Sequence, residues 1–177
     1  MAIISKKICL VGDFGVGKTS LIRRFVERQF SDQYLSTVGV KISKKTLELQ
    51  VGEEQKNQNL QLMIWDLEGH TKFKAIAPSY LQGSSGALVV GDVTRQETID
   101  RIPEHINLFF SVNAKGFIIL ALNKSDLVDE EKLQKLEQLL QSSKQERVLA
   151  IYQTSAKNGS NVDEIFQKLA SRIIAPP

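Results

Sequence analysis

The sequence of 177 residues lacks the features that mark secreted, membrane-spanning and nucleic-acid-binding chains. It has one cysteine, Cys9, which excludes an internal disulfide, and its cysteine and histidines show no zinc-site spacing. No apolar run approaches the roughly 18 residues that a membrane-spanning helix needs. The net charge of +3, from 23 Lys and Arg against 20 Asp and Glu, is too small for a nucleic-acid-binding surface. We therefore expect no nucleic-acid partner and a reducing, cytoplasmic location.

The two ends of the sequence also lack signals for lipid attachment. Ala2 stands where N-myristoylation requires glycine, and the closing residues 175–177 include no cysteine for prenylation. The first residues lack the basic and apolar segments of a signal peptide. We expect no intrinsic membrane anchor in this chain, so membrane association would depend on residues or partners outside it.

The composition is that of an ordinary globular protein. Hydrophobic residues make up 42% of the chain and charged residues 24%, which excludes wholesale disorder and fibrous repeats. The length fits one hydrophobic core, and the sequence shows no internal repeat and no long linker. We expect a single domain that spans residues 1–177.

Apolar runs alternate with helical patterns along the chain. Continuous apolar runs typical of strands buried on both faces occur at 8–11, 60–65, 86–93, 116–122 and 148–152. Helical spacing occurs at 17–29, 95–112, 130–143 and 161–174. This alternation predicts an α/β domain of three layers around a mostly parallel sheet.

One pair of predicted strands breaks the alternation. Residues 39–51 and 58–66 both read as strands, and the polar link 52–57 between them is too short for a helix. They predict an antiparallel hairpin at the edge of a six-stranded sheet. In such a fold, ligands bind at the carboxyl ends of the strands.

The last predicted helix has both a start signal and a core-facing stripe. Asn161 is expected to cap it, with Glu164 three residues later completing a loose capping box. Apolar residues recur at helical spacing from Val162 through Phe166 to Ile173. They form one apolar side of the helix, which predicts that it packs against the sheet.

Two residues that often carry chemistry are assigned none here. Cys9 lies within an apolar strand pattern and is expected in the core. His105, within the predicted helix 95–112, is interpreted as a surface or cap histidine without a role.

Residues 12–19 match the phosphate-binding pattern G-x-x-x-x-G-K-S/T between a predicted strand and a predicted helix. Glycines allow successive backbone N–H groups to wrap phosphates, and the helix adds its positive N-terminal end. Lys18 would reach the outer phosphates, and the Thr19 hydroxyl would ligate Mg²⁺. The pattern predicts a nucleoside triphosphate site, and the strand–loop–helix context makes a chance match rare. The nucleotide-binding residues expected in it are Gly12, Asp13, Phe14, Gly15, Val16, Gly17, Lys18, Thr19 and Ser20.

A second motif indicates which base is bound. Residues 123–126, Asn-Lys-Ser-Asp, and 154–157, Thr-Ser-Ala-Lys, each follow a predicted strand, at the same edge as the phosphate loop. A carboxylate at Asp126 would accept from guanine N1 and N2, whereas adenine offers no such pair of donors. Taken alone, residues 123–126 are equally well explained as a turn or helix cap. Beside a phosphate loop, they predict guanine recognition and argue against a kinase or ATPase that binds adenine.

With these motifs, the chain resembles the small GTPases of the Ras superfamily, and most of all the Rab branch. The resemblance runs from about Lys6 to Ile174. It implies a Ras-like G domain of the P-loop NTPase class, with about five helices around the sheet. It also implies that the chain binds GTP and GDP with Mg²⁺, hydrolyses GTP, and binds effector and regulatory proteins at two switch regions.

The resemblance also implies residues that contact the guanosine. Asn123 and Asp126 match the residues that read guanine, and Lys124 matches the lysine that lies along the base. Phe30 matches an aromatic residue that packs on the base, with an ordinary core position as the alternative. The remaining nucleotide-binding residues expected outside the phosphate loop are Tyr34, Ser155, Ala156 and Lys157, with the Ala156 N–H at guanine O6.

Two segments match the family's nucleotide-dependent switches. Thr37 matches the threonine that binds Mg²⁺ and the γ-phosphate, although a β-branched residue before a strand is also a structural choice. Asp66 matches the acidic residue that holds Mg²⁺, and Gly69 matches the glycine whose N–H meets the γ-phosphate. The expected metal ligands are therefore Thr19, Thr37 and Asp66, and loss of the γ-phosphate would release both segments.

The sequence departs from the family pattern at two catalytic positions. His70 replaces the glutamine that orients the attacking water, and Phe14 replaces a small residue beside the γ-phosphate. We expect both changes to slow hydrolysis, with catalysis by His70, Gly69, Lys18 and Thr37. One alternative is that His70 takes over water positioning. Another is a nucleotide-bound interaction module with negligible hydrolysis.

A hydrophobic triad presented to effectors in the Rab branch is matched by Ile42, Trp65 and Tyr80. We expect a protein-binding surface there, with a buried Trp65 as the alternative. Lys41 replaces a commonly acidic residue, so the effectors of familiar Rab proteins are not assumed.

Overall fold

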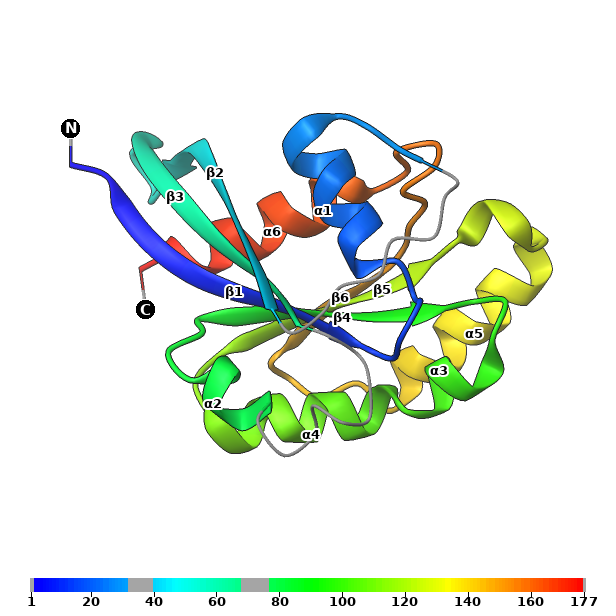
Figure 1. Cartoon of the computed structure of the whole chain (residues 1–177). Helices are drawn as coiled ribbons and strands as arrows, with labels where there is room; N and C mark the ends of the chain where they lie inside the picture. The colour runs from blue at the N-terminus through cyan, green and yellow to red at the C-terminus, as the bar shows by residue number, and fades with distance from the viewer. Residues whose placement is uncertain (1, 32–39, 68–76, 177) are drawn as a thin grey trace.

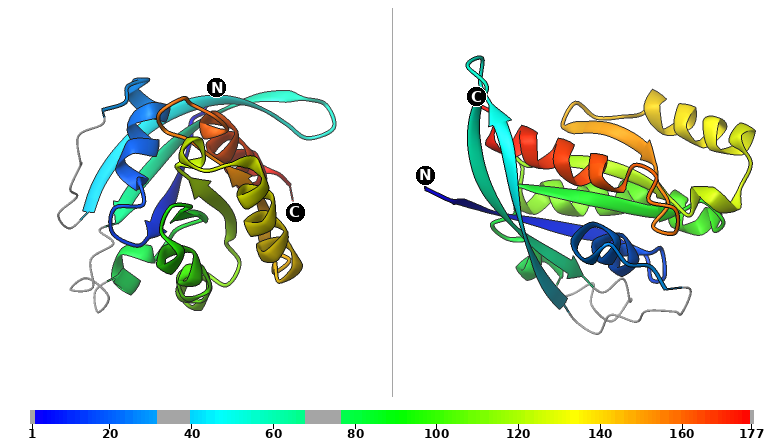
Figure 2. Two further views of the ribbon diagram at one scale, coloured as in Figure 1. Left: turned by 90° about the vertical axis from the view of Figure 1, so that its right-hand side faces the viewer. Right: turned by 90° about the horizontal axis from the view of Figure 1, so that it is seen from above.

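A six-stranded sheet in the order β2-β3-β1-β4-β5-β6 forms the middle layer of the protein (Figure 1). The computed structural model describes residues 2–31, 40–67 and 77–176. Helices α1 and α6 cover one face of the sheet, and α2, α3, α4 and α5 cover the other (Figure 2). The three-layer α/β architecture predicted from the alternation of strands and helices is confirmed.

The elements lie where the sequence patterns place them, with small differences in their bounds. The strands are β1 (Ile4–Gly12), β2 (Val40–Val51), β3 (Lys56–Leu67), β4 (Gly86–Asp92), β5 (Phe117–Asn123) and β6 (Val148–Gln153). The helices are α1 (Lys18–Glu27), α2 (Ala77–Leu81), α3 (Gln96–Asp100), α4 (Ile102–Val112), α5 (Glu130–Ser142) and α6 (Val162–Ile174), with a short 3₁₀ turn at Ser125–Leu127.

Strand β1 pairs in parallel with β3 and β4, and the parallel ladder continues through β5 to β6. Strand β2 pairs with β3 in antiparallel register, from Val40 opposite Leu67 to Val51 opposite Lys56. The predicted edge hairpin is therefore confirmed, but its connection is shorter than expected. The polar residues Lys56 and Asn57 belong to β3, because they pair with Val51 and Gln50.

The helix predicted at 95–112 is divided into α3 and α4, with Arg101 between them. Pro103 near the start of α4 explains the division, because proline has no N–H to donate to the carbonyl of the preceding turn. If the two pieces are counted together, the expectation of about five helices agrees with the structure.

The capping box predicted for α6 is wrong. Asn161 precedes the helix with a left-handed φ of 56°, and its side chain makes no cap hydrogen bond. Its amide Nδ2 instead donates to the carbonyl of Gln153 at 2.8 Å. The predicted core-facing stripe is confirmed, since Val162, Ile165 and Phe166 are buried.

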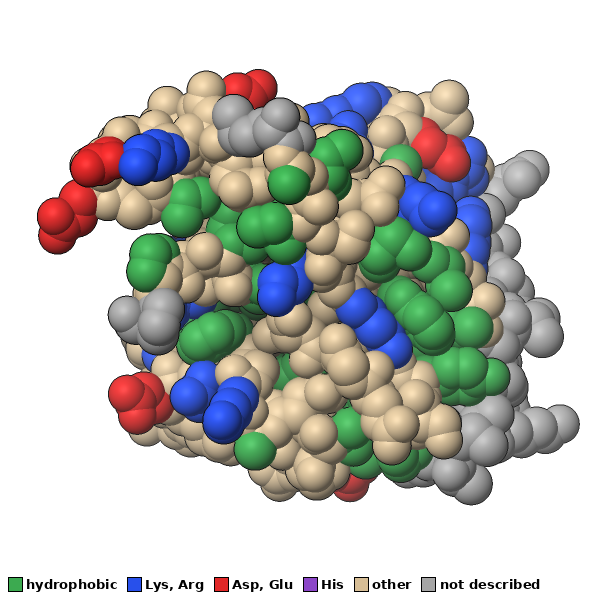
Figure 3. Space-filling view, turned by 90° about the vertical axis from the view of Figure 1, so that its left-hand side faces the viewer, with side chains coloured by type: hydrophobic (Ala, Val, Ile, Leu, Met, Phe, Trp, Pro, Cys, Tyr) green, Lys and Arg blue, Asp and Glu red, His purple; other side chains and the backbone are tan. Residues whose placement is uncertain are grey.

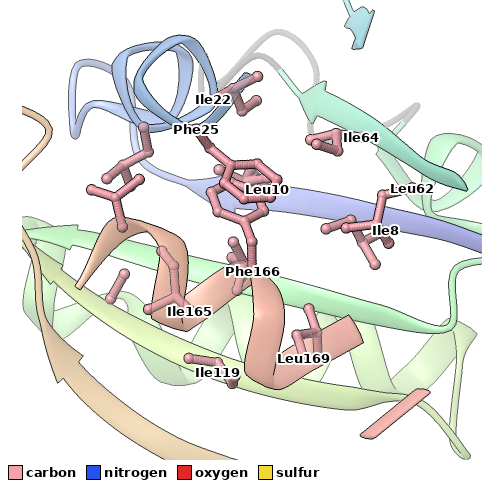
Figure 4. Packing of buried hydrophobic residues seen from close by; sticks show 14 of the residues in the cluster. Ile8, Leu10, Ile22, Phe25, Leu62, Ile64, Ile119, Ile165, Phe166 and Leu169 are labelled. Atoms are coloured by element: carbon pink, nitrogen blue, oxygen red, sulfur yellow. The ribbon is translucent and has the colours of Figure 1, made fainter. Parts of the chain in front are cut away.

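The sheet separates two hydrophobic clusters, one under each layer of helices. On the α1 and α6 side, the rings of Phe25 and Phe166 are stacked with centroids 4.1 Å apart (Figure 4). Full burial of such a side chain contributes about 1.5–3 kcal/mol to folding. Cys9 is buried in the opposite cluster, as predicted.

The amino ends of the parallel strands, near both chain termini, carry hydrophobic and basic side chains side by side (Figure 3). Ile3 and Ile4 are exposed there. The guanidinium groups of Arg147 and Arg172 lie over the ring of Phe117, 5.1 and 4.6 Å from its centroid. Within the described ranges, none of the helices has the length and apolar character required to cross a membrane.

Candidate nucleotide-binding site

Buried polar side chains gather at the carboxyl ends of the parallel strands. Burying such groups costs free energy unless each finds a partner, so their concentration at one edge marks a candidate site. Ser84, before β4, is the exception among the buried polar residues that the structure describes. The others are Asp13, Lys18, Asp66, Asp92, Thr98, Asn123, Thr154 and Ser155.

The predicted phosphate loop joins β1 to α1 at this edge, and Gly17 immediately precedes the helix. Gly17 has a φ of 102°, which residues with a side chain rarely adopt. A Cβ at this position would collide with the side-chain amide of Asn123. Glycine is therefore required here both by the backbone angle and by the close approach of β5.

The ammonium group of Lys18 lies inside the loop. The side chain is buried, with 6% of the residue exposed. Its Nζ donates to the carbonyls of Gly12 and Asp13, at 3.1 Å each. A positive charge is thus held beside the start of α1, where the N-terminal end of a helix favours anions.

Two of the three predicted metal ligands lie in contact with each other. Thr19 Oγ1 donates to Asp66 Oδ2 at 2.5 Å, and Asp66 is only 1% exposed. Hydroxyl and carboxylate oxygens are the donors that Mg²⁺ prefers, so this pair fits that ion. The third predicted ligand, Thr37, lies outside the described residues.

The two predicted guanine-reading loops are joined by hydrogen bonds. Ser155 Oγ donates to Asp126 Oδ1 at 2.8 Å, and Thr154 Oγ1 donates to Asn123 Oδ1 at 3.1 Å. The backbone N–H of Ser125 donates to the Thr154 carbonyl at 3.0 Å. The Asp126 carboxylate is therefore oriented by Ser155 from the neighbouring loop.

The same loops are joined to the phosphate loop. Asn123 Nδ2 donates to the Val16 carbonyl at 2.9 Å, and Lys124 Nζ donates to the Gly15 carbonyl at 3.0 Å. These contacts bring Lys18 and the loop after β5 to one edge of the sheet. The structure therefore brings together the two motifs on which the prediction of guanine-nucleotide binding depends.

Asp92, at the end of β4, is a buried acidic residue that the sequence interpretation did not include. Lys124 Nζ lies 2.8 Å from Asp92 Oδ2, and the N–H and hydroxyl of Thr94 donate to Oδ1 at 2.9 and 2.6 Å. Burial is the largest single influence on the pKa of Asp92 and raises it. The hydrogen bonds from Lys124 and Thr94 outweigh it, so the pKa is lowered overall. Lys124 is therefore in contact with both the Asp92 carboxylate and the phosphate loop.

The segment that contains α3 and α4 also contacts the phosphate loop. Arg101 forms an ion pair with Asp13, and His105 Nε2 lies 2.9 Å from the other carboxylate oxygen of Asp13. Arg95 Nη1 donates to the Phe14 carbonyl at 2.9 Å. His105 was interpreted as a surface or cap histidine without a role, but the structure places its ring against the phosphate loop. The only signal in the sequence was the i,i+4 spacing of Arg101 and His105, which places both on one side of a helix but does not name the element they face.

The two aromatic residues predicted near the nucleotide differ in environment. Phe14 is 42% exposed, in keeping with a side chain at the opening of the loop. Phe30 is partly buried and packs against the hydrophobic cluster on the α1 and α6 side. Four further predicted residues lie outside the described part of the chain: Tyr34, Thr37, Gly69 and His70.

The three residues of the predicted effector surface lie next to one another. Ile42 pairs with Trp65 across β2 and β3 and is 45% exposed. The rings of Trp65 and Tyr80 are 6.4 Å apart, and the ammonium of Lys7 lies 3.7 Å from the Trp65 ring. Trp65 is half-buried, so it is neither fully exposed on a protein-binding surface nor fully buried, the two alternatives considered for it.

Comparison with known proteins identifies relatives along nearly the whole chain. The family model described as "Ras family" matches residues 7–175. The chain is 33% identical over 175 residues to Ras-related protein Rab-22A of Homo sapiens, covering 98% of this chain and 86% of that protein. It is 34% identical over 169 residues to Ras-related protein Rab-13 of Canis lupus familiaris, covering 95% of this chain and 79% of the relative. Ras-related protein RABF2b of Arabidopsis thaliana is 36% identical over 171 residues, covering 96% and 82%.

The described fold agrees with this match, since a mostly parallel sheet carries one antiparallel edge strand and a phosphate loop after its first strand. The phosphate loop and the loops after β5 and β6 lie at one edge and are joined by hydrogen bonds. The chain belongs to the Ras family of small GTP-binding proteins and is a Rab-like member of it.

Proposed function

We propose that the chain is a guanine-nucleotide switch that binds GTP and GDP with Mg²⁺, hydrolyses GTP slowly, and binds partner proteins in its GTP state. GTP binding and GTPase activity are general to the Ras family, to which the chain belongs. The observation that carries the proposal is the direct connection between the two recognition motifs. Asn123 donates to the phosphate loop, and Asp126, three residues later, accepts from Ser155 of the loop after β6. We propose that residues 1–177 act as one Ras-like G domain in the cytoplasm.

The phosphate and metal side of the proposed site uses charge and oxygen donors from two elements. Lys18, already beside the loop carbonyls, would turn its ammonium to the outer phosphates. Thr19 and Asp66 supply the oxygens that suit Mg²⁺, with Thr37 proposed as the third. When bound, the ion neutralises charge on the phosphates that react. The proposed nucleotide contacts within the loop are the backbone N–H groups between Gly12 and Ser20.

The proposed base site distinguishes guanine from adenine through one carboxylate. One Asp126 carboxylate oxygen accepts from Ser155. We propose that the other oxygen accepts from the N–H groups of guanine N1 and N2. An adenine would leave this carboxylate without donors, and a site built to bond a donor rejects a ligand that lacks it. Phe30, Tyr34, Lys124, Ala156 and Lys157 are proposed to complete the base and ribose contacts.

Slow hydrolysis is proposed from two side chains. Catalysis of phosphoryl transfer depends on positioning the attacking water and stabilising charge on the transferred group. His70 stands where the small GTPases that the chain resembles carry a glutamine. We propose that its different reach positions water less well, with Gly69 and Thr37 holding the γ-phosphate. Phe14, 42% exposed at the loop, would crowd the γ-phosphate and any arginine that a partner inserts.

A second proposed function differs in its output. The same two side chains favour a nucleotide-bound interaction module with negligible hydrolysis, in which GTP keeps the partner surface ordered. Both functions use the neighbouring residues Ile42, Trp65 and Tyr80 as the partner surface. Release of phosphate over hours, with and without candidate activating proteins, separates the two functions.

The proposal is tested by mass analysis of the nucleotide that copurifies with the chain, followed by single-turnover cleavage of GTP. We expect GDP or GTP, and cleavage about tenfold faster in His70→Gln and Phe14→Gly than in the wild type. Ile3→Gly is a matched control, because it removes an exposed apolar side chain at the opposite end of the sheet. A bound adenine nucleotide contradicts the base assignment. Equal cleavage rates in all four chains contradict the explanation from crowding and water positioning.

A further inference from the structure

Asp13 is an acidic residue within the phosphate loop, and both of its carboxylate oxygens are engaged by the segment that contains α4. The residue is 7% exposed. Arg101 pairs with Oδ2, and His105 Nε2 lies 2.9 Å from Oδ1. The side chain therefore points toward α4, and its charge is met by residues distant in sequence.

We propose that Arg101 and His105 are positioning residues for nucleotide binding: both hold Asp13 against α4, and the Arg101 guanidinium neutralises its charge beside the bound phosphates. This inference rests on the nucleotide-binding function proposed above. It adds a role for two residues that do not themselves touch the nucleotide.

Asp13 brings a negative charge to a loop that is proposed to bind an anion. The backbone N–H groups of the loop are proposed to receive a polyphosphate, and Asp13 adds a negative charge to that same loop. Like charges at short distance repel, most of all where water is excluded. Arg101 offsets this repulsion because its guanidinium is always charged. GTP carries more negative charge than GDP, so the offset favours GTP more than GDP.

The segment that carries Arg95 and Arg101 is itself anchored to the protein core. Arg101 lies at the break between α3 and α4, where Ile102 is buried and anchors the chain. Thr98, also buried, exchanges hydrogen bonds with the backbone of Asp92 at 2.9 and 3.0 Å. Arg95 adds a third contact, from its guanidinium to the Phe14 carbonyl. Asp13 and Phe14 are thus both bound to the segment of α3 and α4, which is itself joined to the end of β4 through Thr98.

The side chains that contact one another at Asp13 differ in solvent exposure, and this determines how much free energy the loss of each partner is expected to cost. The Arg101 side chain is 50% exposed, whereas the side chains of His105 and Asp13 are 19% and 10% exposed. Removing Arg101 would leave the largely buried Asp13 carboxylate with one partner, which costs more than the net value of the pair. Removing both partners' charges together avoids this penalty.

The test measures dissociation of fluorescent GDP and of a non-hydrolysable GTP analogue from the full chain. We expect Arg101→Gln to release GDP about tenfold faster, and the GTP analogue faster still, as when one member of a partly buried charge pair is removed. In an Asp13→Asn background, Arg101→Gln should have little further effect. Arg147→Gln is the matched control, since Arg147 contacts Lys115 and Phe117 at the opposite end of the sheet.

Two further measurements separate positioning from general stability. Arg101→Lys, which restores the charge without the planar fork, should recover most of the difference between GTP and GDP. The ³¹P resonances of bound GDP should shift in Arg101→Gln and His105→Gln but not in Arg147→Gln. Where Arg101→Gln is too unstable for these measurements, the double variant Asp13→Asn/Arg101→Gln and His105→Gln provide them.

The outcomes distinguish the two levels of the proposal. A wild-type chain that binds no guanine nucleotide overturns the proposed function, and this inference with it. A chain that binds GDP, but whose dissociation rate is unchanged in Arg101→Gln and His105→Gln, overturns this inference alone. Equal effects of Arg101→Gln in the presence and absence of the Asp13 carboxylate also overturn it.

Discussion

The carboxyl and amino ends of the parallel strands differ in whether their side-chain contacts are buried or exposed. At the carboxyl ends, Asp92, Asn123 and Ser155 are buried. Each forms a hydrogen bond with a side chain or backbone group of a nearby loop. At the amino ends, two guanidinium groups lie over the ring of Phe117, and Ile3 remains exposed. Buried polar groups are costly when a partner is lost, whereas exposed contacts are replaced by water. The difference indicates that single substitutions at the carboxyl ends change nucleotide binding and those at the amino ends change only stability.

The largest loss of nucleotide affinity is expected from a substitution at Gly17, at the carboxyl end of the sheet. Gly17→Ala places a Cβ against the Asn123 amide and strains a backbone with φ of 102°. Strain of this kind costs about 1–3 kcal/mol, and displacement of Asn123 adds to it. We expect GDP affinity to fall at least about 100-fold, measured by equilibrium titration of a fluorescent nucleotide.

Gly83→Ala is the matched control for Gly17→Ala. Gly83 has a φ of 77°, and a Cβ there would meet nothing within 4 Å. We expect it to lower the free energy of unfolding by about 1 kcal/mol and to leave GDP affinity unchanged. Equal affinity losses in the two variants would show that the close approach of Asn123 has no special importance.

The second expected effect is a pH dependence at Asp92. Its pKa is lowered in the folded chain, because the hydrogen bonds of Lys124 and Thr94 outweigh burial, so it stabilises the fold above its unfolded pKa of about 3.9. That contribution is lost as the pH falls through the lowered folded pKa. Asp92→Asn should cost about 1–3 kcal/mol at pH 7 and progressively less as the pH falls below 4, measured by urea unfolding. A difference that stays constant from pH 7 to pH 3 would exclude this carboxylate as the source.

The third effect concerns the hydrogen bond between the two loops of the proposed base site. Ser155→Ala removes the hydroxyl that donates to Asp126 at 2.8 Å. Loss of one hydrogen bond to a charged group is expected to reduce affinity for GDP about tenfold. The matched change Ser85→Ala, before β4 at the other end, should leave affinity as it is. If both variants bind GDP like the wild type, the orientation of Asp126 does not depend on Ser155.

The smallest effect is expected at the amino ends. Arg172→Gln removes one of the two guanidinium groups over the Phe117 ring. An exposed cation–π contact contributes about 0.5–1 kcal/mol, so the thermal midpoint should fall by a few degrees. Nucleotide dissociation should be unaffected. A faster dissociation rate in this variant would contradict the functional separation of the two ends.

Much of the fold was predictable because each element carries a periodic pattern of its own. The buried strands β4 and β5 appear as continuous apolar runs, and the stripe on α6 is continuous from Val162 to Phe166. Local signals failed where a more distant partner prevailed. Asn161 has the residue type of an N-cap, but its amide bonds to Gln153 eight residues earlier, and this leaves no side-chain cap.

The candidate site was predictable to the extent that it is written in short motifs. The phosphate loop and the Asn-Lys-Ser-Asp segment are each contiguous, and the rule for carboxyl ends of strands places them together. The contact of Asp13 with Arg101 and His105 joins residues more than 80 positions apart. No spacing in the sequence states which loop a helix side faces, so this contact required the structure. Asp92, at the end of β4, satisfied the same carboxyl-end rule and was missed for lack of a motif.

Asn123 stands where three loops meet, and this has an evolutionary consequence. Its amide donates to the carbonyl of Val16 and accepts from the hydroxyl of Thr154. A substitution that alters base preference through either neighbour also moves the backbone that surrounds the polyphosphate. Laboratory selection for a new base should therefore enrich compensating changes in residues 12–19, and lineages that diverge in one of these loops should diverge in the others as well.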